Sequence, residues 1–359
     1  MAVICDIWAK KLDHYEFNKN IIKLINHILN EQNIYFGDRK QIEFIKKEKE
    51  LYNIKFIDIN ILKVQKIKLF FNYFFNLYKI QKIKSDKIFI LNSLPIVIFL
   101  SKVIFNSKKE IYFFLHGMDR LEQENKGMYK YLKYFFKFRN NKNRYKYIVL
   151  GENIKKNLIK IFPNMEEQIF SIDHPYSFEK EYGNKEINEI LKLGTVGIIS
   201  QEKGLNNIFE FIEKNNEKFS FKHIGKSLTK MSEGFKRYFP YRNSFLEKDK
   251  FEEEILNLDY ILILYPNDSY KLTASGVYFD CIKYNKPLLG LKNQYFGYMF
   301  KKYGEIGKLF ESIDEIIEYL SQERKILDID YDIFHKNMKN IKKVLNKNVE
   351  KQLKEIIGV

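Results

Sequence analysis

The sequence has few cysteines: only Cys5 and Cys281 occur among 359 residues. Two cysteines cannot build a disulfide framework, and such scarcity is typical of proteins that stay in a reducing compartment. The first residues, Met1–Asp6, lack the basic start and the long apolar run of a signal peptide. We therefore expect a cytoplasmic protein.

Long apolar runs are also missing. The longest, Leu94–Phe105, is interrupted by Pro95 and by Ser101 and Lys102, and it is too short to cross a bilayer. The six histidines show no metal-ligand spacing, so we expect no metal site. Neither a zinc-finger spacing nor an aromatic RNA-binding motif is present.

The chain is strongly basic, with a formal net charge of +16 and a pI of about 9.3. A charge of this sign attracts phosphates, nucleic acids and anionic lipids. However, Lys, Ile, Asn, Phe and Tyr are abundant together, as in proteins from AT-rich genomes. We therefore do not take the charge as a sign of nucleic-acid binding, and we expect no nucleic-acid partner.

The hydrophobic pattern predicts an α/β fold. Strands are expected at Ala2–Ile7, Asn33–Phe36 and Ile54–Ile59, and helical periodicity lies between them. Alternation of this kind indicates a parallel sheet with right-handed crossovers, that is, a Rossmann-like domain. The length is sufficient for two domains of roughly 150–200 residues each.

A candidate site residue follows the strand expected at Glu110–Leu115, which ends in His116 and Gly117. Open α/β sheets bind ligands at the carboxyl ends of their strands. His116 is therefore a candidate acid, base or hydrogen-bond donor, and the alternative is a hydrogen-bonded structural histidine. His14, near Asp13 and Glu16, is a weaker second candidate for contact with an acceptor substrate.

Two expected helices, 64–84 and 129–139, combine aromatic and basic residues. This combination suits a membrane surface, and we consider contact with the inner face of a membrane. The alternative is a pair of core helices with solvated lysine faces.

The most informative stretch runs from Asp259 to Leu291. It predicts a strand at Tyr260–Tyr265, a break at 266–269, a helix from about Ser275 to Tyr284 and a strand at Leu288–Leu291. The helix start predicts an anion site because its N–H groups lack partners within the helix and its dipole is positive there.

The residues at this helix start are small or apolar and could hold a diphosphate: Thr273, Ala274, Ser275, Gly276 and Val277. Asp280 lies one turn further on, and its side chain leans back toward the helix start, where it could bind ligand hydroxyls. A phosphate cradle beside a hydroxyl acceptor suggests a nucleotide-sugar pocket. The alternative is an ordinary capped helix.

This stretch resembles the donor-binding segment of GT-B glycosyltransferases of the retaining group 1 type. The resemblance implies that the helix start binds the donor diphosphate and that Asp280 binds the ribose. The family usually has two glutamates eight positions apart; here Asp280 takes the second position and Leu272 the first.

A second likeness lies at 193–204, where a strand containing Gly197 leads to Lys203 and Gly204. In the family, the lysine of this pattern contacts the donor phosphate, which implies that role for Lys203. An arginine usually follows the strand glycine, but here the residue is Ile198. Lys226 and Lys271 are candidates for the missing cationic contact.

The resemblance implies two Rossmann-like domains facing a cleft. We expect an acceptor-binding domain at 1–176, a linker at 177–190, a nucleotide-sugar-binding domain at 191–325 and a C-terminal helix at 326–359 that packs back toward the first domain. The implied function is transfer of a hexose from a nucleotide diphosphate sugar to a glycan or lipid-linked acceptor, in surface-polysaccharide biosynthesis (capsule, lipopolysaccharide or O-antigen).

No cofactor is expected, because the nucleotide enters as part of the substrate, and a UDP-sugar is the first expectation. We also expect activity without a metal, because amides and a lysine can stabilise the leaving diphosphate. Two alternatives stay open: a sugar-nucleotide epimerase of the same fold, and a non-catalytic basic binding protein.

Overall fold

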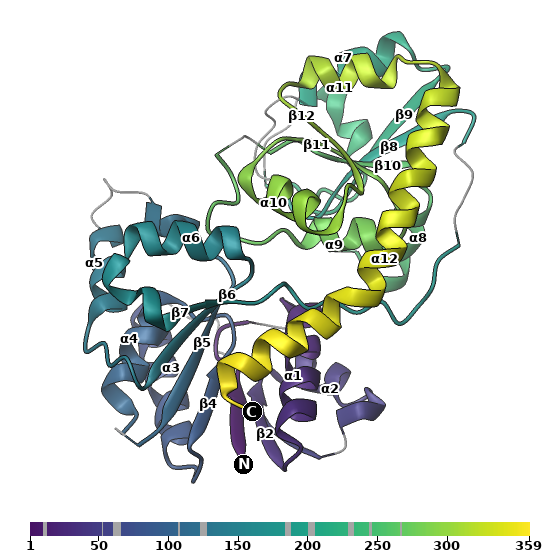
Figure 1. The fold of residues 1–359 in the computed structure, drawn as a ribbon. Coiled ribbons are helices and arrows are strands. Elements are labelled where there is room, and N and C mark those ends of the chain that lie inside the picture. The colour runs from purple at the N-terminus through teal and green to yellow at the C-terminus, as the bar shows by residue number, and fades with distance from the viewer. Residues whose placement is uncertain are drawn as a thin grey trace. The chain divides into compact units, whose positions relative to one another are not determined.

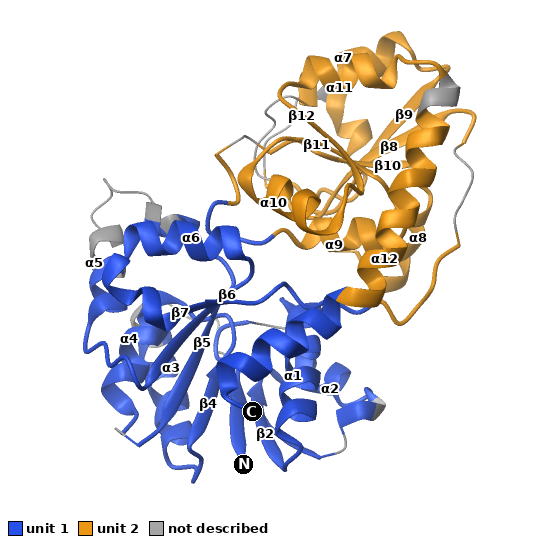
Figure 2. Ribbon diagram, viewed as in Figure 1, with its two compact units in different colours: residues 1–177, 271–274, 345–359 blue, residues 178–270, 275–344 orange. Residues whose placement is uncertain are grey.

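The computed structural model describes residues 1–9, 13–51, 53–59, 66–106, 108–122, 128–183, 188–199, 205–228, 233–243, 246–265 and 268–359. These residues form two compact units (Figure 2). Unit 1 contains Met1–Ser177, Lys271–Ala274 and Leu345–Val359, and unit 2 contains Phe178–Tyr270 and Ser275–Val344. Segment 271–274, which we assigned by chain position to the second domain, is therefore part of unit 1.

Unit 1 is built on a parallel sheet of seven strands in the order β3-β2-β1-β4-β5-β6-β7 (Figure 1). This order, with its reversal between β1 and β4, is that of a Rossmann-like domain. The strands are β1 Ala2–Cys5, β2 Asn33–Gly37, β3 Ile54–Asp58, β4 Lys87–Ile90, β5 Glu110–Leu115, β6 Tyr145–Val149 and β7 Ile169–Ser171. Most of their side chains are buried, as expected for a sheet with helices on both faces.

The helices of unit 1 connect these strands. They are α1 Tyr15–Leu29, α2 Arg39–Ile45, α3 Lys66–Gln81, α4 Pro95–Ile104, α5 Met128–Lys137 and α6 Glu152–Ile161, with 3-10 turns at Lys49–Leu51, Asp119–Glu122 and Pro163–Gln168. Pro95 begins α4, where its missing N–H costs no hydrogen bond. In Figure 1, α3 and α4 lie on one side of the sheet and α1 and α2 on the other.

Unit 2 contains a parallel sheet of five strands in the order β12-β11-β10-β8-β9. The strands are β8 Leu191–Val196, β9 Phe219–Ile224, β10 Tyr260–Ile263, β11 Leu288–Leu291 and β12 Gly307–Phe310. The helices are α7 Leu205–Lys214, α8 Lys248–Leu256, α9 Gly276–Lys283, α10 Gln294–Tyr303 and α11 Ile313–Leu320, with a 3-10 turn at Glu233–Tyr238. Its core includes Leu193, Phe209 and Tyr260, all fully or almost fully buried.

The last helix, α12 Arg324–Ile357, is 34 residues long and belongs to both units. Its part in unit 1 begins at Leu345 and buries an apolar stripe at helical spacing, made by Leu345, Val349, Leu353 and Ile356. The end of the helix is also fixed by polar contacts, because Lys87 donates to the carbonyl of Ile357 at 3.1 Å. Among the helices described, none combines the length and the apolar composition that a membrane span requires.

Candidate functional sites

The carboxyl end of the unit 1 sheet is organised by a buried carboxylate. Asp6 follows β1, has no exposed surface, and accepts hydrogen bonds from the backbone of Trp8 at 3.0 Å and Ala9 at 2.9 Å. The side-chain amides of Asn18 and Asn92 donate to it at 2.6 and 2.5 Å. Burial raises the pKa of Asp6, and the four hydrogen bonds oppose this effect. The network ties the loop after β1 to the start of α1 and to the end of β4.

Three histidines gather at the same end of the sheet. His116 follows β5, His174 follows β7, and His14 immediately precedes α1 in a left-handed conformation with φ 55°. The Nε2 atoms of His116 and His174 lie 3.3 Å apart, and the rings of His14 and His116 meet edge to face at 4.3 Å. Phe17 packs against both His116 and His174. The sequence pattern pointed to His116 and His14 but not to His174, which the structure places three residues after the end of β7.

Burial keeps this cluster neutral. It lowers the pKa of His116 well below its usual value, and the neighbouring His14 and His174 act in the same direction. It lowers the pKa of His174 to about 4. The pKa of His14 is also lowered by burial, although Asp6 and Asp13 oppose the shift. At pH 7 the His116–His174 pair therefore carries no charge, and residue His116 is partly exposed.

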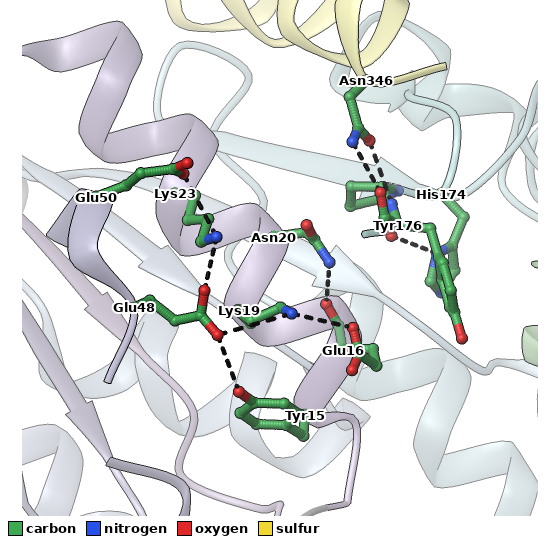
Figure 3. Close-up of polar contacts among 11 residues, drawn as sticks. Tyr15, Glu16, Lys19, Asn20, Lys23, Glu48, Glu50, His174, Tyr176 and Asn346 are labelled. Atoms are coloured by element: carbon green, nitrogen blue, oxygen red, sulfur yellow. Dashed lines mark hydrogen bonds and ion pairs between the residues drawn. The ribbon is translucent and has the colours of Figure 1, made fainter. Parts of the chain in front are cut away.

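Side chains of α12 bind the backbone before and after His174, and Figure 3 shows the contact of Asn346 with Tyr176. Asn346 accepts from the backbone N–H of Tyr176 at 3.2 Å and donates to its carbonyl at 2.7 Å. On the other side, Gln352 accepts from the backbone N–H of Asp173 at 2.8 Å. His174 is also buried, so the contacts with α12 and the packing around the residue together fix its position.

A charged network stabilises the beginning of α1 (Figure 3). Lys19, whose side chain is only 5% exposed, lies 3.3 Å from Glu16 and 3.8 Å from Glu48. Glu48 also pairs with Lys23 at 2.8 Å and accepts from the Tyr15 hydroxyl at 3.4 Å. Lys19 and Lys23 therefore form their ion pairs within unit 1, and the network stabilises the first turn of α1, which follows His14.

Asp119 fixes segment 271–274 on unit 1. Its carboxylate accepts from the backbone N–H of Leu272 at 2.9 Å and from the hydroxyl of Thr273 at 2.5 Å. Gly117 and Thr273 form an antiparallel bridge, and Met118 donates to the carbonyl of Leu272 at 3.1 Å. Leu272 itself is 1% exposed. The position at which the family places a glutamate therefore carries a core residue in this chain.

The start of α9 in unit 2 has the features of an anion site. Ser275 is its N-cap, but the serine side chain does not cap the helix. It is buried, and its Oγ finds no hydrogen-bond partner among the described residues. The first N–H groups of a helix have no partner within it. Gly276 is exposed, and a Cβ built on it would meet no atom within 4 Å, so a ligand can approach this backbone.

Two glycines bring the neighbouring loops of unit 2 together. Gly197 follows β8 with φ +95°, and Gly225 follows β9 with φ +149°. A Cβ on Gly225 would lie 1.9 Å from the carbonyl oxygen of Gly197, so only glycine fits there. A Cβ on Gly197 would lie 3.8 Å from Cγ2 of Val277. The loop after β8 and the start of α9 are thus in van der Waals range.

The remaining predicted residues are distributed as follows. Asp280 is partly exposed in α9, four residues after Gly276 and therefore on the same helix face. Ile198 is 48% exposed, and its carbonyl accepts from the Tyr265 hydroxyl at 3.4 Å. Lys226 follows Gly225 in unit 2, whereas Lys271 lies with Thr273 and Ala274 in unit 1. Lys203 lies outside the described residues.

No group of three or more His, Cys, Asp or Glu in the described part of the chain is arranged to hold a metal ion. The three clustered histidines are included in this search.

Solved structures share this architecture over nearly the whole chain. HepE (Alr3699) from Anabaena, in complex with UDP and glucose, is similar with a TM-score of 0.66 at 12% identity, over 100% of this chain and 99% of HepE. The apo form of the lipopolysaccharide outer core galactosyltransferase WaaB is similar with a TM-score of 0.61 at 12% identity, over 99% of each chain. The chain has the GT-B fold.

The same comparison finds a second class of GT-B enzyme. UDP-GlcNAc 2-epimerase from Neisseria meningitidis, bound to UDP-GlcNAc, is similar with a TM-score of 0.55 at 14% identity, over 100% of this chain and 99% of the epimerase. No protein-family model matches the chain, and no curated protein matches it in sequence. The predicted GT-B fold is thus confirmed, while the choice between activities depends on the sites.

Proposed function

We propose that this chain is a glycosyltransferase that transfers a hexose from a nucleotide diphosphate sugar to a glycan or lipid-linked acceptor. The observation that carries the proposal is the uncapped start of α9 beside Gly197. Its exposed glycine and small side chains leave the first amides of the helix open to a ligand. Backbone amides and the helix dipole favour a diphosphate there.

Asp280 would bind the ribose of the donor. A ligand anchored at Gly276 presents its sugar hydroxyls to the same helix face, and a carboxylate accepts hydrogen bonds from two adjacent hydroxyls. Gly197, Ser275 and Val277 would line the diphosphate subsite, together with Lys203 and Lys226. Thr273, Ala274 and Lys271 are weaker candidates, because they belong to the segment held on unit 1.

His116 is the proposed catalytic residue of unit 1. It lies at the carboxyl end of β5, where open α/β sheets bind their ligands, and the residue is partly exposed. Its lowered pKa keeps a neutral imidazole available over the whole physiological pH range. The hydroxyl of the acceptor, or of the sugar that is transferred, is the group that such an imidazole binds.

The diphosphate site needs no metal in this proposal. Helix amides and lysines supply positive charge to the leaving diphosphate, which is the stabilisation that a metal ion would otherwise provide. Full turnover in excess EDTA would support metal independence. Loss of turnover that Mn²⁺ restores would contradict it.

Exposed aromatic residues favour a membrane-bound acceptor. Phe71, Phe75 and Tyr78 on α3 are 51%, 57% and 46% exposed at helical spacing, and Tyr134 on α5 is 56% exposed. The exposed Lys82 lies over the ring of Tyr78. Exposed aromatic side chains beside a lysine, as on α3, suit the surface of an anionic membrane. We include peripheral contact with the cytoplasmic membrane face in the proposal.

The second candidate function is epimerisation of a sugar nucleotide, which the similarity to UDP-GlcNAc 2-epimerases over the whole chain favours. The two candidates differ in the need for an acceptor. Incubation of the enzyme with UDP-GlcNAc alone, followed by proton NMR of the sugar, separates them. A new configuration at C2 without added acceptor would favour the epimerase.

A thermal-shift panel of UDP, GDP, CDP and ADP tests the shared basis of both functions. A ligand at a hundredfold excess over its Kd stabilises the folded chain by about 2.7 kcal/mol. We expect one nucleotide, most simply UDP, to raise the Tm clearly more than the others. If none of the four raises it, the nucleotide-sugar proposal is wrong.

A further inference from the structure

The contact between His116 and His174 fixes where each ring carries its proton. Their Nε2 atoms are 3.3 Å apart, which is hydrogen-bond distance. A hydrogen bond between two neutral imidazoles needs one protonated and one bare nitrogen. Both rings are neutral at pH 7 because burial lowers their pKa values. One Nε2 must therefore donate and the other must accept.

The other nitrogen of His174 decides which ring donates. Nδ1 of His174 lies 2.9 Å from the carbonyl oxygen of Pro175, and a carbonyl oxygen can only accept. His174 therefore carries its proton on Nδ1, and its Nε2 is bare. His116 must then donate through Nε2. The second nitrogen of His116, Nδ1, is left with a lone pair and no proton.

His174 is well placed to impose this arrangement. The residue is only 4% exposed, so bulk water has little access to compete for Nε2. The backbone on both sides of it is bound by Asn346 and Gln352 of α12, and Phe17 packs on its ring. The ring cannot turn without breaking the contact with Pro175. Among the described residues, His14 is the further titratable group that lowers the pKa of His116. Asp6 and Asp13 in turn raise the pKa of His14.

We propose that His174 is a positioning residue that holds His116 as the tautomer protonated on Nε2. His116 then meets a substrate hydroxyl through Nδ1 only, as a hydrogen-bond acceptor or base, and not as an acid or a donor. The substrate part of this inference rests on the proposed function. The tautomer itself depends only on unit 1. The inference selects among the three roles that the sequence left open for His116.

Nuclear magnetic resonance of protein labelled with ¹⁵N-histidine tests the tautomer without any activity. The chain has six histidines, and the signals of His116 are assigned by their loss in His116→Gln. At pH 7.5 we expect His116 to be protonated on Nε2 and bare on Nδ1, and His174 to show the reverse. A proton on Nδ1 of His116, or a charged ring, would overturn the proposal.

Two substitutions of His174 test the positioning role. His174→Gln keeps a side-chain oxygen that can accept from His116, whereas His174→Leu fills similar space without an acceptor. We expect the Leu variant to show both tautomers of His116. We also expect its kcat to fall about fivefold with little change in KM, because the loss of one hydrogen bond of about 1 kcal/mol corresponds to a factor of about five in rate. The Gln variant should restore both readouts.

The outcomes separate the two levels of the proposal. Circular dichroism and Tm of both variants show whether they fold, and the wild-type spectrum remains decisive if the Leu variant does not. A wild-type tautomer in folded His174→Leu would overturn the positioning role. The expected tautomers in a protein that turns over no nucleotide sugar would leave the positioning role intact and contradict the proposed function.

Discussion

Asp119 and Thr273 are joined by a hydrogen bond of 2.5 Å across 154 positions of the sequence, from the threonine hydroxyl to the carboxylate. Thr273 is two residues before the N-cap of α9, where the sequence pattern suggested a phosphate ligand. Its hydroxyl is instead occupied within unit 1. A hydroxyl that donates to a carboxylate cannot at the same time donate fully to a phosphate, so we expect Thr273 to contribute little to diphosphate binding.

This relationship predicts the effect of Thr273→Val, which removes the hydroxyl and keeps the shape. We expect about 1 kcal/mol lower stability, because a hydrogen bond to an exposed carboxylate is lost. The Kd for the diphosphate, measured by calorimetry, should change less than twofold. Thr273→Ser is the matched control and should behave as wild type. A tenfold weaker Kd in the Val variant alone would restore the phosphate role.

The neutral histidines predict the pH dependence of stability. Their pKa values are lowered in the folded chain, so protons bind the unfolded chain more tightly. The contribution of these histidines to the free energy of unfolding is therefore fully present above about pH 6.5. It is lost as the pH falls toward the pKa in the folded chain, which is about 4 for His174. Trp8, the only tryptophan, lies in unit 1 and reports unfolding there by fluorescence.

We expect the free energy of unfolding of unit 1, measured with urea, to be lower at pH 5.5 than at pH 7.5. In His174→Gln this loss should be smaller by roughly 1 kcal/mol, since one neutral histidine is removed. His27→Gln is the control, because His27 is exposed and outside the cluster. Equal pH dependence in wild type and His174→Gln would show that His174 is not held neutral.

Asp280 predicts a preference for ribose over deoxyribose. If its carboxylate accepts from the ribose hydroxyls, deoxy-UDP should bind about fivefold to tenfold more weakly than UDP to the wild type. Asp280→Asn should weaken the binding of UDP and remove most of the difference in affinity between UDP and deoxy-UDP. Calorimetry of the four combinations measures this coupling directly. An undiminished preference for UDP in the variant would remove Asp280 from the ribose site.

The exposed face of α3 predicts binding to anionic vesicles. Flotation with vesicles of phosphatidylglycerol and phosphatidylcholine should carry the wild type upward, and the double variant Phe71→Ser, Phe75→Ser should remain at the bottom. Phe44→Ser on α2 is the control, because Phe44 is similarly exposed on another helix. High salt should weaken flotation, since lysines contribute. A wild type that does not float removes the membrane from the proposal.

The sequence predicted those parts of the fold that depend on local pattern. Buried apolar runs between turn residues identified β11 at Leu288–Leu291, and β10 is two residues shorter than expected. The residue types at Ser275 and Gly276 predicted the helix start correctly, although the Ser275 side chain makes no capping hydrogen bond. The resemblance to group 1 enzymes led to the GT-B fold, which the solved structures share.

Contacts between distant parts of the chain could not be predicted in this way. His174 and His116 are 58 positions apart and come together because β5 and β7 both border β6. No pattern indicates that Asp119 holds Leu272 and Thr273 on unit 1. Leu272 stands where the resembled family usually has a glutamate, and in the structure it is a buried residue, 1% exposed. Such roles follow from the order of strands in the sheet, which local periodicity does not specify.

The most direct test of the central claim places a charge at the start of α9. Gly276→Asp adds a carboxylate where the helix dipole favours it, so stability should be kept or raised by about 0.5 kcal/mol. The same carboxylate should repel a diphosphate. Gly276→Asn is the matched neutral control, of equal size and without charge.

Calorimetric titration with UDP, or with whichever nucleotide the thermal-shift panel selects, gives the result. We predict a Kd at least tenfold weaker in Gly276→Asp than in Gly276→Asn, with both variants as stable as the wild type. Equal affinity in the two variants would show that the diphosphate does not bind at the start of α9, and would contradict the account.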